Sequence, residues 1–150
     1  MLTLLDDHTA TADLIMQLDE SLQRVLAHKE PIIRRFYDRF LSERPDAERL
    51  FAGVDLEKQS LMLTMALIVV EAYSRDSYPA VEHYLHVLGD RHREAGVSRE
   101  LFAPFRDCLI ETIRSSQADG WDDALTEAWK RALDRATQTM FQGYEGDFPF

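Results

Sequence analysis

The chain has 150 residues, of which 45% are hydrophobic and 10% aromatic, and it carries a formal net charge of −10. The length and the apolar content are typical of one globular domain with a sizeable core, and they exclude a disordered chain. The negative charge argues against nucleic acid and anionic membranes as partners, because phosphate groups are bound by basic surfaces.

The N-terminus does not resemble a secretory signal, because Asp6 and Asp7 stand where a signal peptide would carry positive charge. No apolar run approaches the ~20 residues that span a bilayer. Cys108 is the one cysteine of the chain, which excludes an internal disulfide and a zinc site built from cysteines. We therefore expect a cytoplasmic protein.

Helical spacing of apolar residues dominates the chain, and strand-like alternation is nearly absent. Glycine and proline divide the sequence into helix-length segments, and Pro31 and Pro79 each suit the first turn of a helix. We expect one all-α domain over residues 1–150, with residues 1–9 and 146–150 loosely held. The pattern predicts about seven helices, at residues 10–28, 31–44, 46–51, 55–75, 79–94, 98–117 and 121–143.

Tyr37 is a polar residue on an apolar face of the predicted helix 31–44. Ile33, Phe36 and Phe40 share that face. A core tyrosine with its hydroxyl at the rim would explain the position without any function. The hydroxyl needs a partner wherever it is buried, since an unsatisfied buried polar group costs about 1–3 kcal/mol.

Gln59 lies on one stripe with Leu63 and Leu67, near the start of a long apolar helix. A glutamine that faces water at the start of a helix is the simpler interpretation. Lys58 competes for the inward position, because Met62 follows it at similar spacing. We favour Gln59 as the inward residue, because an inward lysine would bury a charge with no evident partner.

His92 ends an apolar stripe formed by Val81, Leu85 and Leu88. Taken alone, it is best explained as a core histidine bonded to a backbone carbonyl. A zinc hydrolase would need three protein ligands, and a di-iron bundle would need paired Glu-x-x-His motifs; the sequence supplies neither. No motif supports Ser–His–Asp catalysis. A haem fits these residues, because one neutral imidazole holds the iron on one side while the other side stays open to a gas.

Four stretches, in their order along the chain, make this sequence resemble a globin. They are RFYDRFLSERPDAERLF, GVDLEKQSLMLTMAL, LGDRHREAGV and LTEAWKRAL, the last with Trp129 at the family's tryptophan. The chain is most similar to single-domain bacterial haemoglobins related to flavohaemoglobins, over about residues 14–145. The resemblance implies a globin fold, with about seven helices packed around one haem pocket, and haem b as the cofactor.

The resemblance also implies roles for individual residues. His92 would be the iron ligand, Tyr37 and Gln59 the residues that donate hydrogen bonds to a bound gas, and Phe51 the aromatic residue on the haem face. Arg91 would reach a haem propionate or remain a solvated arginine. The further haem contacts that we expect are Leu63, Leu88, Val97, Phe102 and Phe105.

Two positions depart from the flavohaemoglobin-like pattern. In that group a tyrosine and a glutamate typically polarise the iron-bound imidazole, and here the matching positions hold Phe102 and Tyr144, with Glu145 beside Tyr144. We therefore expect a weaker or differently built electronic push on His92. This change puts peroxidase-like chemistry in doubt more than it affects the binding of oxygen.

The resemblance implies reversible binding of O2, NO and CO at an iron that is five-coordinate or weakly six-coordinate. One alternative is a nitric oxide dioxygenase that takes electrons from a separate reductase, because no flavin or nicotinamide domain is expected within 150 residues. Another alternative is a haem-based gas sensor. The sequence is compatible with a monomer or a homodimer.

Overall fold

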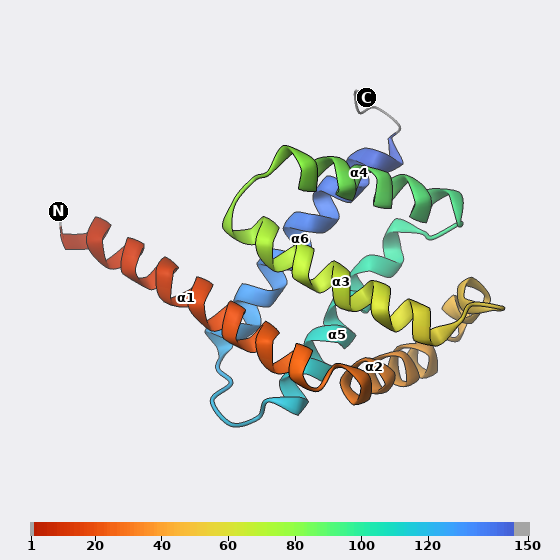
Figure 1. Ribbon diagram of the computed structural model, residues 1–150, viewed down its shortest axis with the longest axis horizontal. Coiled ribbons are helices and arrows are strands. Elements are labelled where there is room, and N and C mark those ends of the chain that lie inside the picture. Colours follow the sequence, from red (N-terminus) through yellow and green to blue (C-terminus); the bar gives the residue numbers. More distant parts are fainter. Residues whose placement is uncertain (1, 146–150) are drawn as a thin grey trace.

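The computed structural model describes the backbone of residues 2–145 and the side chains of residues 11–145. Its elements are α1 (Leu2–Ala27), α2 (Lys29–Glu43), η1 (Pro45–Phe51), α3 (Leu56–Arg75), α4 (Pro79–Glu94), η2 (Arg99–Leu101), α5 (Phe102–Ser116) and α6 (Asp123–Tyr144), where η marks a short 3₁₀ helix. Figure 1 shows α3 and α4 lying across α6, while α2 and α5 form the lower part of the bundle. The all-α class predicted from the apolar spacing is confirmed.

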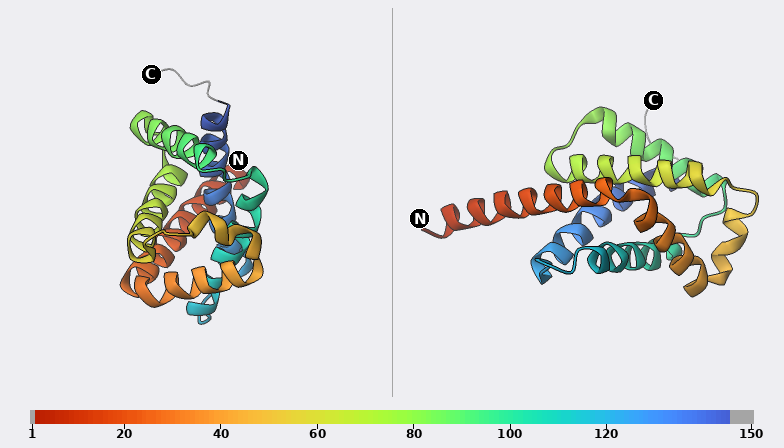
Figure 2. Two further views of the ribbon diagram at one scale, coloured as in Figure 1. Left: turned by 90° about the vertical axis from the view of Figure 1, so that its right-hand side faces the viewer. Right: turned by 60° about the horizontal axis from the view of Figure 1, so that its bottom comes forward.

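The first helix is longer than the sequence pattern predicted. It begins at Leu2 rather than at residue 10, and no glycine or proline interrupts the chain before Pro31. Once formed, a helix extends by one hydrogen bond for each residue added, so it continues until a residue breaks it. The right-hand view of Figure 2 shows the N-terminal end of α1 projecting away from the other helices. The predicted loose tail, residues 146–150, lies outside the described residues.

Aspartate caps fix where α3 and α6 begin. Asp55 Oδ1 accepts a hydrogen bond from the Glu57 amide at 2.9 Å, and Asp122 Oδ1 accepts one from the Leu125 amide at 2.8 Å. Each cap satisfies an N–H that has no partner within the helix and contributes about 1 kcal/mol. The segment predicted as one helix at residues 98–117 consists of η2 followed directly by α5.

Helices α4 and α6 cross at two glycines. A Cβ atom at Gly89 would lie 1.9 Å from the carbonyl oxygen of Met140, and one at Gly143 would lie 2.1 Å from that of His86. Because no side chain fits at either position, the two helix backbones approach each other directly. This crossing holds the last turns of α4, which carry His92, against α6.

Replacing Gly89 with alanine should lower the free energy of unfolding by at least about 1–3 kcal/mol, because the added methyl group forces two backbones apart. A urea titration measures this as a lower midpoint with an unchanged slope. The matched control is Gln138→Ala on the exposed face of α6, for which we expect a change within about 0.5 kcal/mol. A Gly89→Ala protein as stable as the parent would contradict the close crossing.

A buried polar network ties α1 to the end of α5 and to α6. Ser21 Oγ donates to Gln117 Oε1 at 2.7 Å and accepts from Trp129 Nε1 at 2.9 Å, while Gln117 Nε2 donates to the Ser21 carbonyl at 2.9 Å. All three side chains are buried. Since each of these polar groups has a partner, their burial is not penalised, and the network sets the relative position of the three elements.

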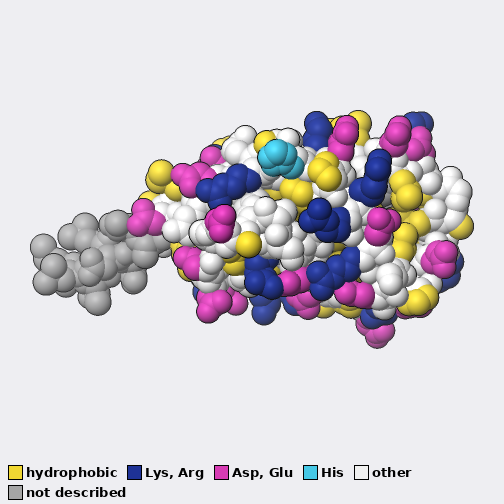
Figure 3. Space-filling model, turned by 90° about the horizontal axis from the view of Figure 1, so that it is seen from below, with side chains coloured by type: hydrophobic (Ala, Val, Ile, Leu, Met, Phe, Trp, Pro, Cys, Tyr) yellow, Lys and Arg dark blue, Asp and Glu magenta, His cyan; other side chains and the backbone are white. Residues whose placement is uncertain are grey.

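The surface carries mixed charge. Figure 3 shows Lys and Arg side chains interspersed with Asp and Glu side chains on one face of the molecule, with small hydrophobic clusters between them. No helix within the described residues combines the length and the apolar content that crossing a bilayer requires.

Candidate functional site

An apolar cavity of about 530 Å³ lies inside the bundle. Its walls come from α2, η1, α3, α4, α5 and α6 and from the loop that follows α4. All of the site residues predicted from the sequence line this cavity: Tyr37, Phe51, Gln59, Leu63, Leu88, Arg91, His92, Val97, Phe102 and Phe105. The fold therefore brings together side chains that are far apart in the sequence.

His92, in the last turn of α4, has one ring nitrogen bonded to the backbone and the other unprotonated. Nδ1 lies 2.7 Å from the carbonyl oxygen of Leu88. Because a carbonyl can only accept, Nδ1 carries the proton and Nε2 keeps its lone pair. Burial lowers the pKa of His92, so the imidazole is neutral at neutral pH. A core histidine would make this same bond, and it is also the bond that orients an imidazole bound to a metal.

A left-handed turn follows His92 and brings the chain back to the cavity. Gly96 has a φ of +84°, a conformation that suits glycine. The Val97 amide then donates to the His92 carbonyl at 3.0 Å. This bond places the Val97 side chain among the residues that line the cavity.

Tyr37 and Gln59 form a hydrogen-bonded pair at the cavity wall. Gln59 Nε2 donates to the Tyr37 hydroxyl oxygen at 3.2 Å. Tyr37 is buried and Gln59 is half-buried, whereas Lys58 is exposed and does not line the cavity. Because Gln59 supplies the proton of this bond, the phenol's own O–H remains available to a further acceptor in the cavity.

Burial raises the pKa of Tyr37 to about 12, and the hydrogen bond from Gln59 opposes this shift without cancelling it. The phenol therefore remains protonated throughout the physiological pH range. It can act as a hydrogen-bond donor and not as a charged ligand in that range.

Aromatic rings stiffen the wall behind this pair. The ring of Phe51 packs edge-on against Tyr37, with 5.5 Å between centroids. Phe105 packs edge-on against Phe36 at 4.8 Å and against Phe40 at 5.3 Å. Edge-to-face packing of this kind is worth about 0.5–1.5 kcal/mol for each pair beyond the area it buries, so these rings hold α2, η1 and α5 in fixed positions around the cavity.

Comparison with known proteins identifies the fold and the family. The sequence matches the globin family over residues 34–140, which is well over half of the chain. The chain belongs to the globin family. A bacterial globin from Campylobacter jejuni has the same fold, with a TM-score of 0.75 and 17% sequence identity over 90% of this chain and 96% of that chain. Globin-family proteins bind haem, and the globin fold expected from the sequence motifs is confirmed.

Two relatives show how far the sequence similarity extends. The flavohemoprotein of Bacillus subtilis is 24% identical over 106 residues, which make up 70% of this globin and 27% of that protein. A protein of Gossypium hirsutum named anaerobic nitrite reductase is 28% identical over 114 residues, covering 67% of this globin and 70% of that protein. The chain thus spans about a quarter of the flavohemoprotein.

Phe102 and Tyr144, the two positions at which the sequence analysis expects a departure, lie near His92 and Val97. The ring of Phe102 lies 6.0 Å from that of His92, centroid to centroid. The Tyr144 hydroxyl donates to the Val97 carbonyl at 2.8 Å, so its hydrogen bond goes to the backbone. The partner of His92 is the Leu88 carbonyl, which is a weaker acceptor than a carboxylate because it carries no net charge.

The sequence analysis missed several residues at the edge of the cavity. Met62, Met65 and Tyr84 line it and are exposed, as is Arg91. In the sequence, the methionines share a helical face with Lys58, which competed with the face of Gln59 for the inward position. The pattern gave no signal for Tyr84. Together these side chains mark where the cavity opens between α3 and α4.

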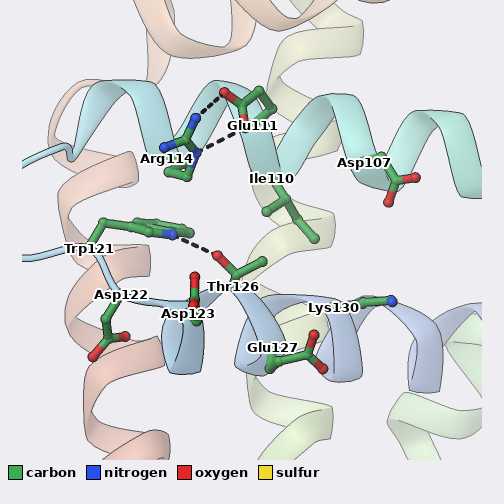
Figure 4. A pocket seen from close by; sticks show the side chains of 10 residues that line it. All are labelled: Asp107, Ile110, Glu111, Arg114, Trp121, Asp122, Asp123, Thr126, Glu127 and Lys130. Atoms are coloured by element: carbon green, nitrogen blue, oxygen red, sulfur yellow. Dashed lines mark hydrogen bonds and ion pairs between the residues drawn. The ribbon is translucent and has the colours of Figure 1, made fainter.

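A second hollow, of about 510 Å³, lies between α5 and the start of α6, and it contains none of the predicted site residues. Figure 4 shows two bonded pairs among its polar side chains. Trp121 Nε1 donates to Thr126 Oγ1 at 2.8 Å, and Arg114 Nε donates to Glu111 Oε2 at 2.9 Å. Each pair lies on one side of the hollow, the first at the start of α6 and the second on α5. Its largely polar lining distinguishes this hollow from the apolar cavity that contains His92.

Proposed function

We propose that this globin holds haem b in the cavity through His92 Nε2 and binds dioxygen reversibly. Haem, when bound, supplies an iron that takes an imidazole on one side and a diatomic gas on the other. The observation that supports this most directly is a neutral imidazole with a free nitrogen in the same cavity as a protonated phenol.

Tyr37 and Gln59 have different tasks in this proposal. The phenol O–H of Tyr37 donates to the bound gas, whose atoms carry partial negative charge. Gln59 donates to the phenol oxygen and so turns the phenol proton away from itself and into the cavity. Gln59 is therefore a positioning residue, and its loss should matter less than the loss of the Tyr37 hydroxyl.

Gln59→Leu should raise the rate of oxygen dissociation by about 5-fold to 10-fold, the effect of one neutral hydrogen bond worth roughly 1 kcal/mol. The matched control is Lys58→Leu, which changes the neighbouring residue outside the cavity and should leave the rate unchanged. Stopped-flow displacement of oxygen by CO measures both. If the Lys58 variant changed the rate and the Gln59 variant did not, the inward residue would be the lysine.

Nitric oxide dioxygenation is the second candidate, and the similarity to a flavohemoprotein supports it. The overall reaction adds O2 and one electron to NO to form one nitrate ion, so continued turnover needs an electron donor. In this proposal a separate reductase supplies the electron.

One experiment separates the two functions. The oxygen-loaded protein is mixed with NO in a stopped-flow instrument, alone and then with a supplied reductant, and nitrate is counted for each haem. Nitrate that stops at one equivalent under both conditions supports oxygen binding as the function. Many equivalents with the reductant support the dioxygenase, and a protein that never takes up oxygen contradicts both proposals.

A further inference from the structure

Besides the Tyr37–Gln59 pair, the cavity has a wall made by α5 and α6. Leu109 from α5 and Leu133, Ala136 and Thr137 from α6 line this end. One charged side chain, Arg106 of α5, lines it as well. A charged residue at the wall of an apolar cavity needs an explanation, because burying a charge without partners is costly.

Arg106 spans the wall from the cavity to the surface. Its Nη1 donates to Asp134 Oδ1 on α6 at 2.8 Å, and its Nε donates to Asp107 Oδ1 on its own helix at 2.9 Å. The Arg106 side chain is 21% exposed, while those of Asp107 and Asp134 are 65% and 43% exposed. The Arg106 side chain therefore reaches from the cavity to carboxylates that face solvent.

Two carboxylates bond Arg106 at the same time, and only one of them bridges two helices. Asp134 lies across the gap on α6, so the ion pair with it bridges the two helices. Asp107 is the next residue on α5, so the ion pair with it does not connect the two helices. When the bond to Asp134 breaks, the guanidinium keeps a partner in Asp107. Exposed ion pairs are weak and exposed side chains change rotamer quickly, so the bridge to Asp134 breaks easily.

We propose that small uncharged molecules of the size of dioxygen enter and leave the cavity through a passage between α5 and α6, which the Arg106–Asp134 ion pair closes. The apolar side chains of Leu133 and Ala136 suit such molecules and disfavour ions. This passage lies apart from the opening at Met65 and Tyr84 between α3 and α4. The identity of the physiological ligand rests on the proposed function, whereas the passage itself does not.

The test compares two substitutions that each remove one carboxylate partner of Arg106. Asp134→Asn removes the partner that closes the passage and should speed CO association and escape after flash photolysis by about 2-fold to 5-fold, the effect of one exposed ion pair. Asp107→Asn leaves the bridge to Asp134 in place and removes a partner that Arg106 keeps whether that bridge is made or broken, so both rates should stay close to those of the parent. Arg114→Met is the matched control, because it breaks the Arg114–Glu111 pair of the same helix outside the cavity.

A faster rate in Asp134→Asn alone distinguishes a closing ion pair from general loosening, which would speed both variants. Equal rates in the two variants overturn the proposal. The second measurement is an NMR experiment that needs no iron. Xenon under pressure should shift the amide resonances of Leu133 and Thr137, and xenon should enter and leave the cavity faster in Asp134→Asn than in Asp107→Asn. If the protein binds no haem and still shows these xenon effects, the proposed function is contradicted and the passage is supported. If the resonances do not shift, the passage is contradicted.

Discussion

His92→Gly should lose haem while keeping its helices. We expect haem affinity to fall by more than about 100-fold, since even the outer partners of metal ligands are worth about 10-fold to 100-fold. The reason is that His92 Nε2 is the free imidazole nitrogen of the cavity wall, and no other lining residue is a histidine or a cysteine. Titration of the haem-free protein with haemin, followed by absorption in the Soret region, measures the affinity.

Added imidazole should restore part of the Soret absorption of the His92→Gly protein, because the free base fits the space left by the ring. The matched control is His83→Gly, which removes a histidine of the same helix that does not line the cavity. It should bind haemin as the parent does. Full colour and unchanged gas affinity in His92→Gly would show that a different residue holds the iron.

Tyr37→Phe should raise the rate of oxygen dissociation by about 10-fold to 100-fold, the effect of losing a hydrogen bond to a partly charged ligand, worth roughly 1.5–3 kcal/mol. CO dissociation should change much less, because bound CO carries little charge for the phenol to stabilise. Tyr73→Phe is the matched control, since Tyr73 is buried and bonds Thr139 at 2.9 Å outside the cavity. An unchanged oxygen rate in Tyr37→Phe contradicts the assignment of the donor.

The pH dependence provides an independent check on Tyr37. Burial raises its pKa from the ordinary 10.0 to about 12, so the phenol keeps its proton through pH values at which an exposed tyrosine has lost it. The oxygen dissociation rate of the parent protein should therefore stay flat up to about pH 11 and rise only as the pH approaches the raised pKa. A rise already near pH 10 would show that the phenol is not desolvated.

Much of this site could be predicted because helical periodicity assigns each residue to a face. The predicted inward faces put Tyr37, Gln59 and His92 into one cavity. The choice of Gln59 over Lys58 followed from the cost of burying a charge, and in the structure Lys58 is exposed. The haem roles of these residues remain predictions.

Other features depend on contacts between helices, which periodicity within one helix does not reveal. Gly89 looks like a weak point in a helix until α6 is seen to pass 1.9 Å from its missing Cβ. Arg106 looks like a surface arginine, and its place at the cavity wall follows from the angle between α5 and α6. The early start of α1 was missed because residues 2–9 lack the apolar period on which the prediction relied.

The most direct test of the central claim, that His92 and its cavity hold a gas-binding haem, is the absorption spectrum of the purified protein when oxidised, when reduced and when reduced under CO. We predict a Soret band with one haem for each chain, and a shift of that band when CO is added to the reduced protein. A protein that stays colourless after incubation with haemin, or a reduced haem that does not respond to CO, would contradict the claim.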